Sequence, residues 1–171
     1  MEVRSHSLLD GGMTELLAYQ GGRKHRNSCL HARGKHGVFW HSNVAWLIAL
    51  QPGDHLWIVT SGACLRHEDR HAGFLIGLWT VAEVVENPSD DTTQPRGKFR
   101  YRIVADETES ITFDDPVLVD HIVRPEGREK TTPIGRFLAN PKRLLNEQYV
   151  RKLRAAAGHE LALRWLTGTR R

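Results

Sequence analysis

Two apolar segments dominate the pattern of hydrophobic and polar positions along the chain. In residues 55–60 apolar and β-branched side chains alternate with others, which predicts a strand ending at Ser61 and Gly62. Residues 74–85 predict a second strand, because this segment is too long and too apolar to be an exposed edge. The segment between them, residues 63–71, is mostly polar and predicts a charged loop.

Shorter segments flank these two strands. Clusters of Gly, Pro and polar residues mark loops and turns, and a continuous apolar run closed by Pro52 and Gly53 marks a short buried helix. In chain order, the pattern predicts a short strand or the end of a helix at 14–19, a basic surface loop at 20–37 and a turn at 39–43. The short helix follows at 44–50, and a turn-rich connection lies at 86–97.

The second half of the chain first continues the strand pattern. In residues 99–103 aromatic and aliphatic positions alternate with Arg100 and Arg102, which predicts a half-exposed strand with its basic side chains outward. Residues 111–113 and 117–123 predict two more short strands.

The apolar period then becomes helical. Asn140 can cap a helix that has Pro141 at its first position, and Gly158 stands where such a helix would end. Residues 161–166 predict a final short helix.

Together these elements predict an α+β fold, a small curved mixed β-sheet or open β-barrel flanked by helices, with further helices at the C-terminal end. The length predicts one domain over 1–171, with a core of about 14–155 and tails at 1–12 and 167–171. No run of eighteen apolar residues is present, so we expect no membrane partner. The N-terminus lacks an apolar signal core, which predicts a cytoplasmic location.

Basic and acidic residues are unevenly distributed. The chain has 24 Lys and Arg against 20 Asp and Glu, yet residues 23–36 contain no acid and residues 142–154 contain one. Separation by sign favours a polyanion bound on one face, although solvated loops and an ordinary charged helix face would look the same. Eight basic residues are candidates for contacts with nucleic-acid phosphates: Arg23, Lys24, Arg26, Arg33, Lys35, Arg66, Arg70 and Lys98.

The charged loop also contains a pattern typical of zinc proteases. His67 to His71 reads H-E-x-x-H, a motif that binds zinc only when both histidines lie on one face of a stable helix. Gly62 and Gly73 bracket the motif and leave room for barely two turns. A zinc-dependent hydrolase using His67 and His71 is therefore the weakest of the functional hypotheses. Since no other catalytic or cofactor motif is present, we expect neither an enzyme nor a cofactor.

Aromatic residues suggest a different chemistry. Trp40 is followed by His41, Ser42 and Asn43, so that an aromatic plane stands beside small hydrogen-bonding groups. A pocket for one flat ring has this composition, because stacking holds the ring and polar groups contact its edge. The alternative is a hydrophobic lid over the core. Trp57 could likewise face a ligand or pack under the closing helices.

In order along the chain, four segments carry a family resemblance: VFWHSN, LQPGDHLWIVTSG, GFLIGLWTVAEVV and GKFRYRIV. They resemble the YTH and EVE group of the PUA-like superfamily, over roughly residues 14–155. In YTH domains a Trp-x-Ser element is followed by a strand ending in Ser-Gly and then by a Gly-x-x-x-V strand. Residues 40–42, 60–62 and 77–81 match these three elements.

The resemblance implies a barrel-like sheet and a module that inserts one modified base into an aromatic cage. By position, Trp40 would be one cage wall, and Ser42 and Asn43 would contact the base edge. Loop 87–98 contains no Trp for a second wall, which makes the EVE branch, with its readers of modified cytosine, the closer relative. The complete set of pocket candidates is Trp40, His41, Ser42, Asn43, Ser61, Gly62, Tyr19, Gln20 and Trp57.

The sequence therefore predicts a non-catalytic module that binds nucleic acid and recognises a flipped modified base. Modified cytosine in DNA is favoured, and methylated adenine is an alternative. In the EVE branch such modules are often fused to a nuclease in modification-dependent restriction, so a fused or separate nuclease is the expected partner. The second hypothesis is an RNA-binding accessory protein acting on tRNA or rRNA.

Overall fold

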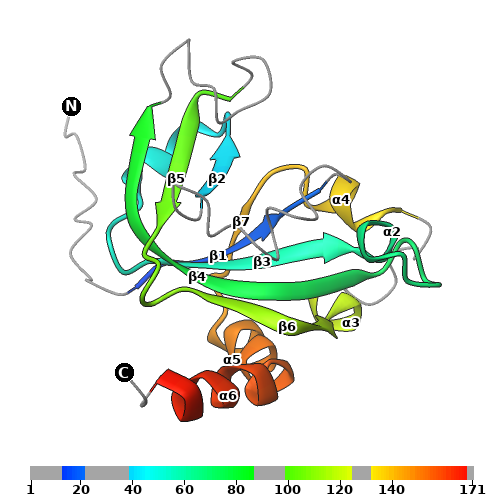
Figure 1. Cartoon of the computed structure of the whole chain (residues 1–171). Helices are drawn as coiled ribbons and strands as arrows, with labels where there is room; N and C mark the ends of the chain where they lie inside the picture. The colour runs from blue at the N-terminus through cyan, green and yellow to red at the C-terminus, as the bar shows by residue number, and fades with distance from the viewer. Residues whose placement is uncertain (1–12, 22–38, 87–98, 125–131, 169–171) are drawn as a thin grey trace.

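The computed structural model describes residues 13–21, 39–86, 99–124 and 132–168 (Figure 1). Within these ranges the chain is α+β, with seven strands in one mixed sheet ordered β2-β5-β4-β3-β1-β7, and β6 paired with β4. The strands are β1 (Glu15–Tyr19), β2 (Phe39–Ser42), β3 (His55–Ser61), β4 (Gly73–Glu86), β5 (Tyr101–Ala105), β6 (Ile111–Leu118) and β7 (Lys142–Arg143). The helices are the 3-10 helix η2 (Ala45–Ala49) and the α-helices α2 (Gly62–Leu65), α3 (Asp120–Val123), α4 (Ile134–Phe137), α5 (Glu147–Ala156) and α6 (Gly158–Gly168).

Strand β4 gives the sheet its curl. It is 14 residues long, pairs with β3 and β6 over its first half, and pairs with β5 over its second half. The pairing register shifts between Val81 and Glu83, and such bulges bend a strand and increase its twist. β4 therefore carries β5 and β2 up over the rest of the sheet, as Figure 1 shows, and the sheet forms a half-barrel. The expected curved mixed sheet with flanking helices is confirmed at this level.

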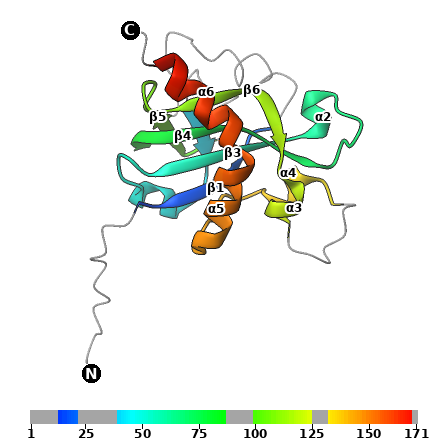
Figure 2. The same cartoon turned by 90° about the horizontal axis from the view of Figure 1, so that it is seen from below.

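Side chains alternate between the two faces of this sheet and form two separate cores. The inner core lies inside the half-barrel and contains Leu16, Ala18, Trp40, Leu47, Leu50, Leu56, Ile58, Ile76, Trp79, Val81, Ile103 and Ala105. The helix-side core lies on the opposite face and includes Leu17, Trp57, Val59 and Leu75 together with Leu153 and Ala157 from the helical end of the chain. Figure 2 shows α5 and α6 crossing that second face.

Several predicted elements are confirmed. Residues 14–19 contribute strand β1, which pairs in parallel with β3, and the two central strands lie close to their predicted bounds. In β5 the buried residues alternate with Arg102 and Val104, as the sequence indicated. None of the helices within the described residues has the length and apolar character needed to cross a membrane.

Two predictions around the first half of the chain were wrong. Residues 39–42 form strand β2 rather than a turn, because β5 offers them an antiparallel partner. The segment predicted as a loop at 63–71 begins with helix α2, whose first turn is capped by the Ser61 hydroxyl accepting from the Cys64 N–H. The short buried helix predicted at 44–50 is a 3-10 helix in which Leu47 is the buried residue.

Two further predictions failed in the second half. Residues 111–118 form one strand, and the segment 120–123 that was predicted as strand is helix α3. The helix predicted from Asn140 instead begins after Asn146, whose side chain accepts from the Gln148 N–H at 2.8 Å. Residues 142 and 143 pair with β1, so tertiary pairing replaces the helix expected there. The final helix α6 is longer than predicted, and the predicted tail at 167–171 begins inside it.

Candidate functional site

The parallel pairing of β1 and β3 brings together four of the predicted pocket residues: Tyr19, Gln20, Ser61 and Gly62. Both strands end at the same edge of the sheet. The Gln20 N–H donates to the Val59 carbonyl at 2.8 Å, and the Thr60 hydroxyl donates to the Gln20 carbonyl at 2.8 Å. The backbone of this end of β1 is therefore fixed, and its side chains alternate between the two faces.

Trp40 reaches this end of β1 from β2. Its indole Nε1 donates to the Tyr19 carbonyl at 3.1 Å. Strand β7 pairs only with Leu16 and Leu17, so it does not extend along the edge of β1 to that carbonyl. Trp40 is 9% exposed and belongs to the inner core. The structure therefore places the ring of Trp40 mainly against the core, with its N–H already engaged.

Gln20 lies on the same inner face, two residues beyond Ala18 on the alternating strand. Its side-chain Oε1 is buried and has no hydrogen-bond partner. The buried Nε1 of Trp79, on β4, also lacks a partner. A buried polar group without a partner costs about 1–3 kcal/mol, so both atoms represent unmet hydrogen bonds on this face.

The other predicted groups next to Trp40 form local contacts. The Ser42 hydroxyl accepts from the Val44 N–H at 3.2 Å, and the Asn43 Oδ1 accepts from the Arg100 N–H at 2.8 Å. His41 stacks on Phe99 with ring centroids 5.9 Å apart. Ser42 and Asn43 thus shape the start of η2 and the approach to β5, and the structure does not bring their side-chain oxygens to Gln20.

Tyr19 and Ser61 lie on the opposite, helix-side face. The Tyr19 hydroxyl donates to the Ser61 Oγ at 3.2 Å, and the Ser61 hydroxyl in turn donates to the Cys64 Sγ at 3.3 Å. Burial raises the pKa of Tyr19 above its ordinary value. A Cβ at Gly21 would lie 2.5 Å from the Tyr19 ring and one at Gly135 would lie 2.6 Å from it, so two glycines make room for this side chain.

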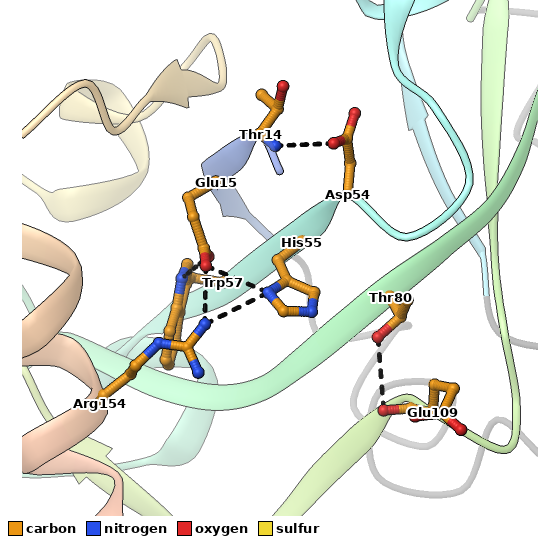
Figure 3. A network of polar contacts seen from close by, with 8 residues as sticks. All are labelled: Thr14, Glu15, Asp54, His55, Trp57, Thr80, Glu109 and Arg154. Carbon is orange, nitrogen blue, oxygen red and sulfur yellow. Dashed lines mark hydrogen bonds and ion pairs between the residues drawn. The ribbon is translucent and has the colours of Figure 1, made fainter. Parts of the chain in front are cut away.

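Trp57 packs under the helices and does not line the same face as Trp40. It is fully buried in the helix-side core, and its Nε1 donates to the Glu15 Oε2 at 2.6 Å. Figure 3 shows how Glu15 also contacts His55 and Arg154. The Glu15 Oε1 lies 3.1 Å from the His55 Nδ1 and 2.8 Å from an Arg154 guanidinium nitrogen. Of the two alternatives for Trp57, the structure shows packing, and its assignment to the base pocket does not fit.

These contacts set the charge state of Glu15. Burial alone would raise the pKa of Glu15, but hydrogen bonds from His55, Arg154 and Trp57, with the charge on His55, lower it below its ordinary value. The network joins β1, β3 and α5. It therefore links helix α5 to the sheet.

The H-E-x-x-H residues are not helical, since α2 ends at Leu65, before the motif. The Asp69 carboxylate accepts from the N–H groups of His71 and Ala72, and the His67 Nδ1 accepts from the Asp69 N–H. This geometry lacks the shared helix face that the zinc-protease motif requires. Among the described residues, no cluster of three or more potential metal-binding side chains occurs.

Of the predicted phosphate contacts, Arg66 and Arg70 lie on the surface of this loop, and both are exposed. Arg66 adopts a left-handed backbone with φ 60°, at the end of α2. The other six lie outside the described residues: Arg23, Lys24, Arg26, Arg33, Lys35 and Lys98.

Sequence reasoning placed Trp79 in the core but missed its unpaired N–H. It also missed the Glu15 network. The sequence contains no pattern that would reveal either feature. Whether a buried polar atom finds a partner depends on neighbours that only the folded sheet brings together. The comparison with family models found no match, and no curated protein matches the chain.

Proposed function

We propose that this chain is a non-catalytic nucleic-acid-binding module with an EVE/YTH-like, PUA-like fold that recognises a modified base extruded from DNA. Modified cytosine is the favoured base. The module would supply specificity to a nuclease, fused or separate, in a modification-dependent restriction system.

The observation that carries this proposal is the unpaired Gln20 Oε1 at the end of β1. An amide oxygen accepts hydrogen bonds, and the exocyclic amine of cytosine or adenine is a donor of the required kind. The unpaired Trp79 N–H on the same inner face could donate to a ring nitrogen or carbonyl of a base. The strand register aligns Trp79 with Leu56 and Leu16, four residues along β1 from Gln20, so the two groups would contact different parts of a bound nucleotide.

In the proposed binding site, unpaired polar atoms rather than exposed aromatic rings would select the base. Trp40 contributes a largely buried ring whose N–H holds the Tyr19 carbonyl. Its contribution would be to form one wall beside Gln20, while the polar atoms without partners select the base. Stacking of a base on an aromatic ring contributes on the order of 1–3 kcal/mol.

The direct test is a binding panel of matched oligonucleotides that carry plain, methylated or hydroxymethylated cytosine, or methylated adenine, in duplex DNA and in RNA. We expect the tightest binding to DNA with modified cytosine, at least about tenfold tighter than to the plain duplex, if one base contact is worth about 1–3 kcal/mol. Equal binding across the panel would contradict base recognition. A preference for structured RNA would instead favour the accessory-protein hypothesis.

A further inference from the structure

We propose that Arg143, stacked on Trp46, binds a backbone phosphate of the strand whose base enters at Gln20. This inference rests on the proposed function and adds a phosphate site to it. The Arg143 guanidinium carbon lies 4.7 Å from the centroid of the Trp46 ring. Stacking uses the face of a guanidinium and leaves its in-plane N–H donors free for the oxygens of a phosphate.

Arg143 is exposed and has no acidic partner within the part of the chain that the structure describes. Two arginines of α5 differ in this respect. Arg151 pairs with Glu147 at 3.1 Å, and Arg154 pairs with Glu15 at 2.8 Å. Arg143 is therefore held in position by an aromatic ring, while no acidic side chain among the described residues pairs with its charge.

The position of Arg143 fits the proposed base site. In the β7–β1 pairing Arg143 stands opposite Leu16, and residues opposite one another in an antiparallel pair share a face of the sheet. Leu16 and Gln20 are four residues apart on β1, so they lie on the same inner face about 13 Å apart. About four steps of a B-form duplex, at 3.4 Å each, cover that distance. A phosphate a few nucleotides from the recognised base would thus reach Arg143.

The C-terminal segment that carries Arg143 is also rich in basic residues. Residues 132–163 contain six Lys and Arg but only two acids, Glu147 and Glu160. Both acids are engaged, Glu147 with Arg151 and Glu160 by accepting from the Asp114 N–H at 3.0 Å. Because α5 crosses the helix-side face, its basic residues would attract a polyanion at Arg143 only over a distance and would make no direct contact. The basic residues are Arg136, Lys142, Arg143, Arg151, Lys152 and Arg154.

The test compares Arg143→Gln with the matched control Arg151→Gln, which removes the same charge from an exposed arginine that already has an acidic partner. Dissociation constants for modified and plain duplexes are measured between about 50 and 200 mM salt. We expect Arg143→Gln to weaken both complexes about eightfold near 0.1 M salt and to reduce the salt slope by about 0.9, as the loss of one phosphate contact predicts. Arg151→Gln should change neither quantity by a comparable amount.

The preference for the modified base should stay unchanged in Arg143→Gln, because a phosphate contact carries no base information. Equal effects of the two substitutions would overturn the phosphate site. If wild type shows no preference for any modified base but Arg143→Gln still lowers the salt slope, base recognition fails while the phosphate site stands. No binding to any nucleic acid would overturn both.

Trp46→Leu tests whether the stacking positions the arginine. The variant keeps the charge of Arg143 but removes the ring beneath it, so we expect weaker binding. Combined with Arg143→Gln it should add no further loss, because the two residues would act through one contact. Additive losses would show that Trp46 acts independently of Arg143. Denaturant unfolding of each variant confirms that the fold is kept.

Discussion

The sequence and the structure suggest different roles for Trp40. The sequence suggested an aromatic wall flanked by hydrogen-bonding groups. In the structure the ring is 9% exposed, packs in the inner core and donates its N–H to the Tyr19 carbonyl. Any loss of binding in a Trp40 variant therefore has to be separated from a loss of stability.

We expect Trp40→Ala to lower the free energy of unfolding by about 3–5 kcal/mol, because it leaves a large cavity in a core. Trp40→Phe keeps an aromatic ring but leaves the Tyr19 carbonyl without its donor, which should cost about 1–3 kcal/mol. Chemical denaturation measures both. Equal stability of wild type and Trp40→Phe would show that the hydrogen bond to Tyr19 contributes nothing to the fold.

For individual residues, the sequence predicted which positions are apolar but not which polar atoms form hydrogen bonds. The alternation in β3 correctly separated Trp57 from Leu56 and Ile58, and these residues do lie in different cores. It could not show that Trp57 donates to Glu15, since the two residues are 42 positions apart. Hydrogen-bond partners at such separations follow from strand pairing, which is a property of the whole sheet.

Helix α5 is attached to the sheet by a buried polar network. Arg154 reaches across from α5 to Glu15 on β1, and Glu15 also accepts from Trp57 and contacts His55 on β3 (Figure 3). Since the three contacts lower the pKa of Glu15, its carboxylate stabilises the folded state above the ordinary pKa of 4.5. That contribution is lost as the pH falls through the lower, folded-state value.

Glu15→Gln should therefore lower the unfolding free energy at pH 7 by about 1–3 kcal/mol, because the buried network loses its charged acceptor. The difference between variant and wild type should shrink as the pH falls below about 4.5. Denaturation midpoints measured from pH 7 to pH 3 give both quantities. Glu147→Gln is the control, because it removes an acid whose pair with Arg151 is solvent-exposed. A gap between Glu15→Gln and wild type that stays constant with pH would contradict the account.

Element boundaries could be predicted from the sequence where local pattern and tertiary pairing agree. β3 and β4 are apolar along most of their length and were placed correctly. Asn140 followed by Pro141 satisfies the rules for a helix start, but β1 offers an edge with which residues 142 and 143 pair instead. Asn146, which does cap the helix, looks no different as a residue type. Capping rules identify candidates, and packing selects among them.

In the whole molecule, the two faces of the sheet differ in how well their polar groups are paired. The helix-side face holds the α5 attachment, Trp57 and the Tyr19–Ser61 contact, all of which are satisfied. The inner face holds the unpaired atoms of Gln20 and Trp79. Unpaired buried polar groups lower the stability of the fold, and in natural proteins they commonly occur at binding sites. The sequence predicted a curved sheet or open barrel, but its list of pocket candidates mixed residues from both faces of that sheet.

The decisive measurement is the ratio of dissociation constants for plain and modified duplex in Gln20→Met, compared with wild type and with Gln148→Met on the exposed surface of α5 as control. Met matches the length of Gln but removes the unpaired acceptor. The account predicts that the preference for the modified base falls about tenfold or more, while the free energy of unfolding stays the same or rises by about 1 kcal/mol. A variant that is destabilised yet keeps the full preference would contradict the account, because Gln20 would then serve the fold and not the base.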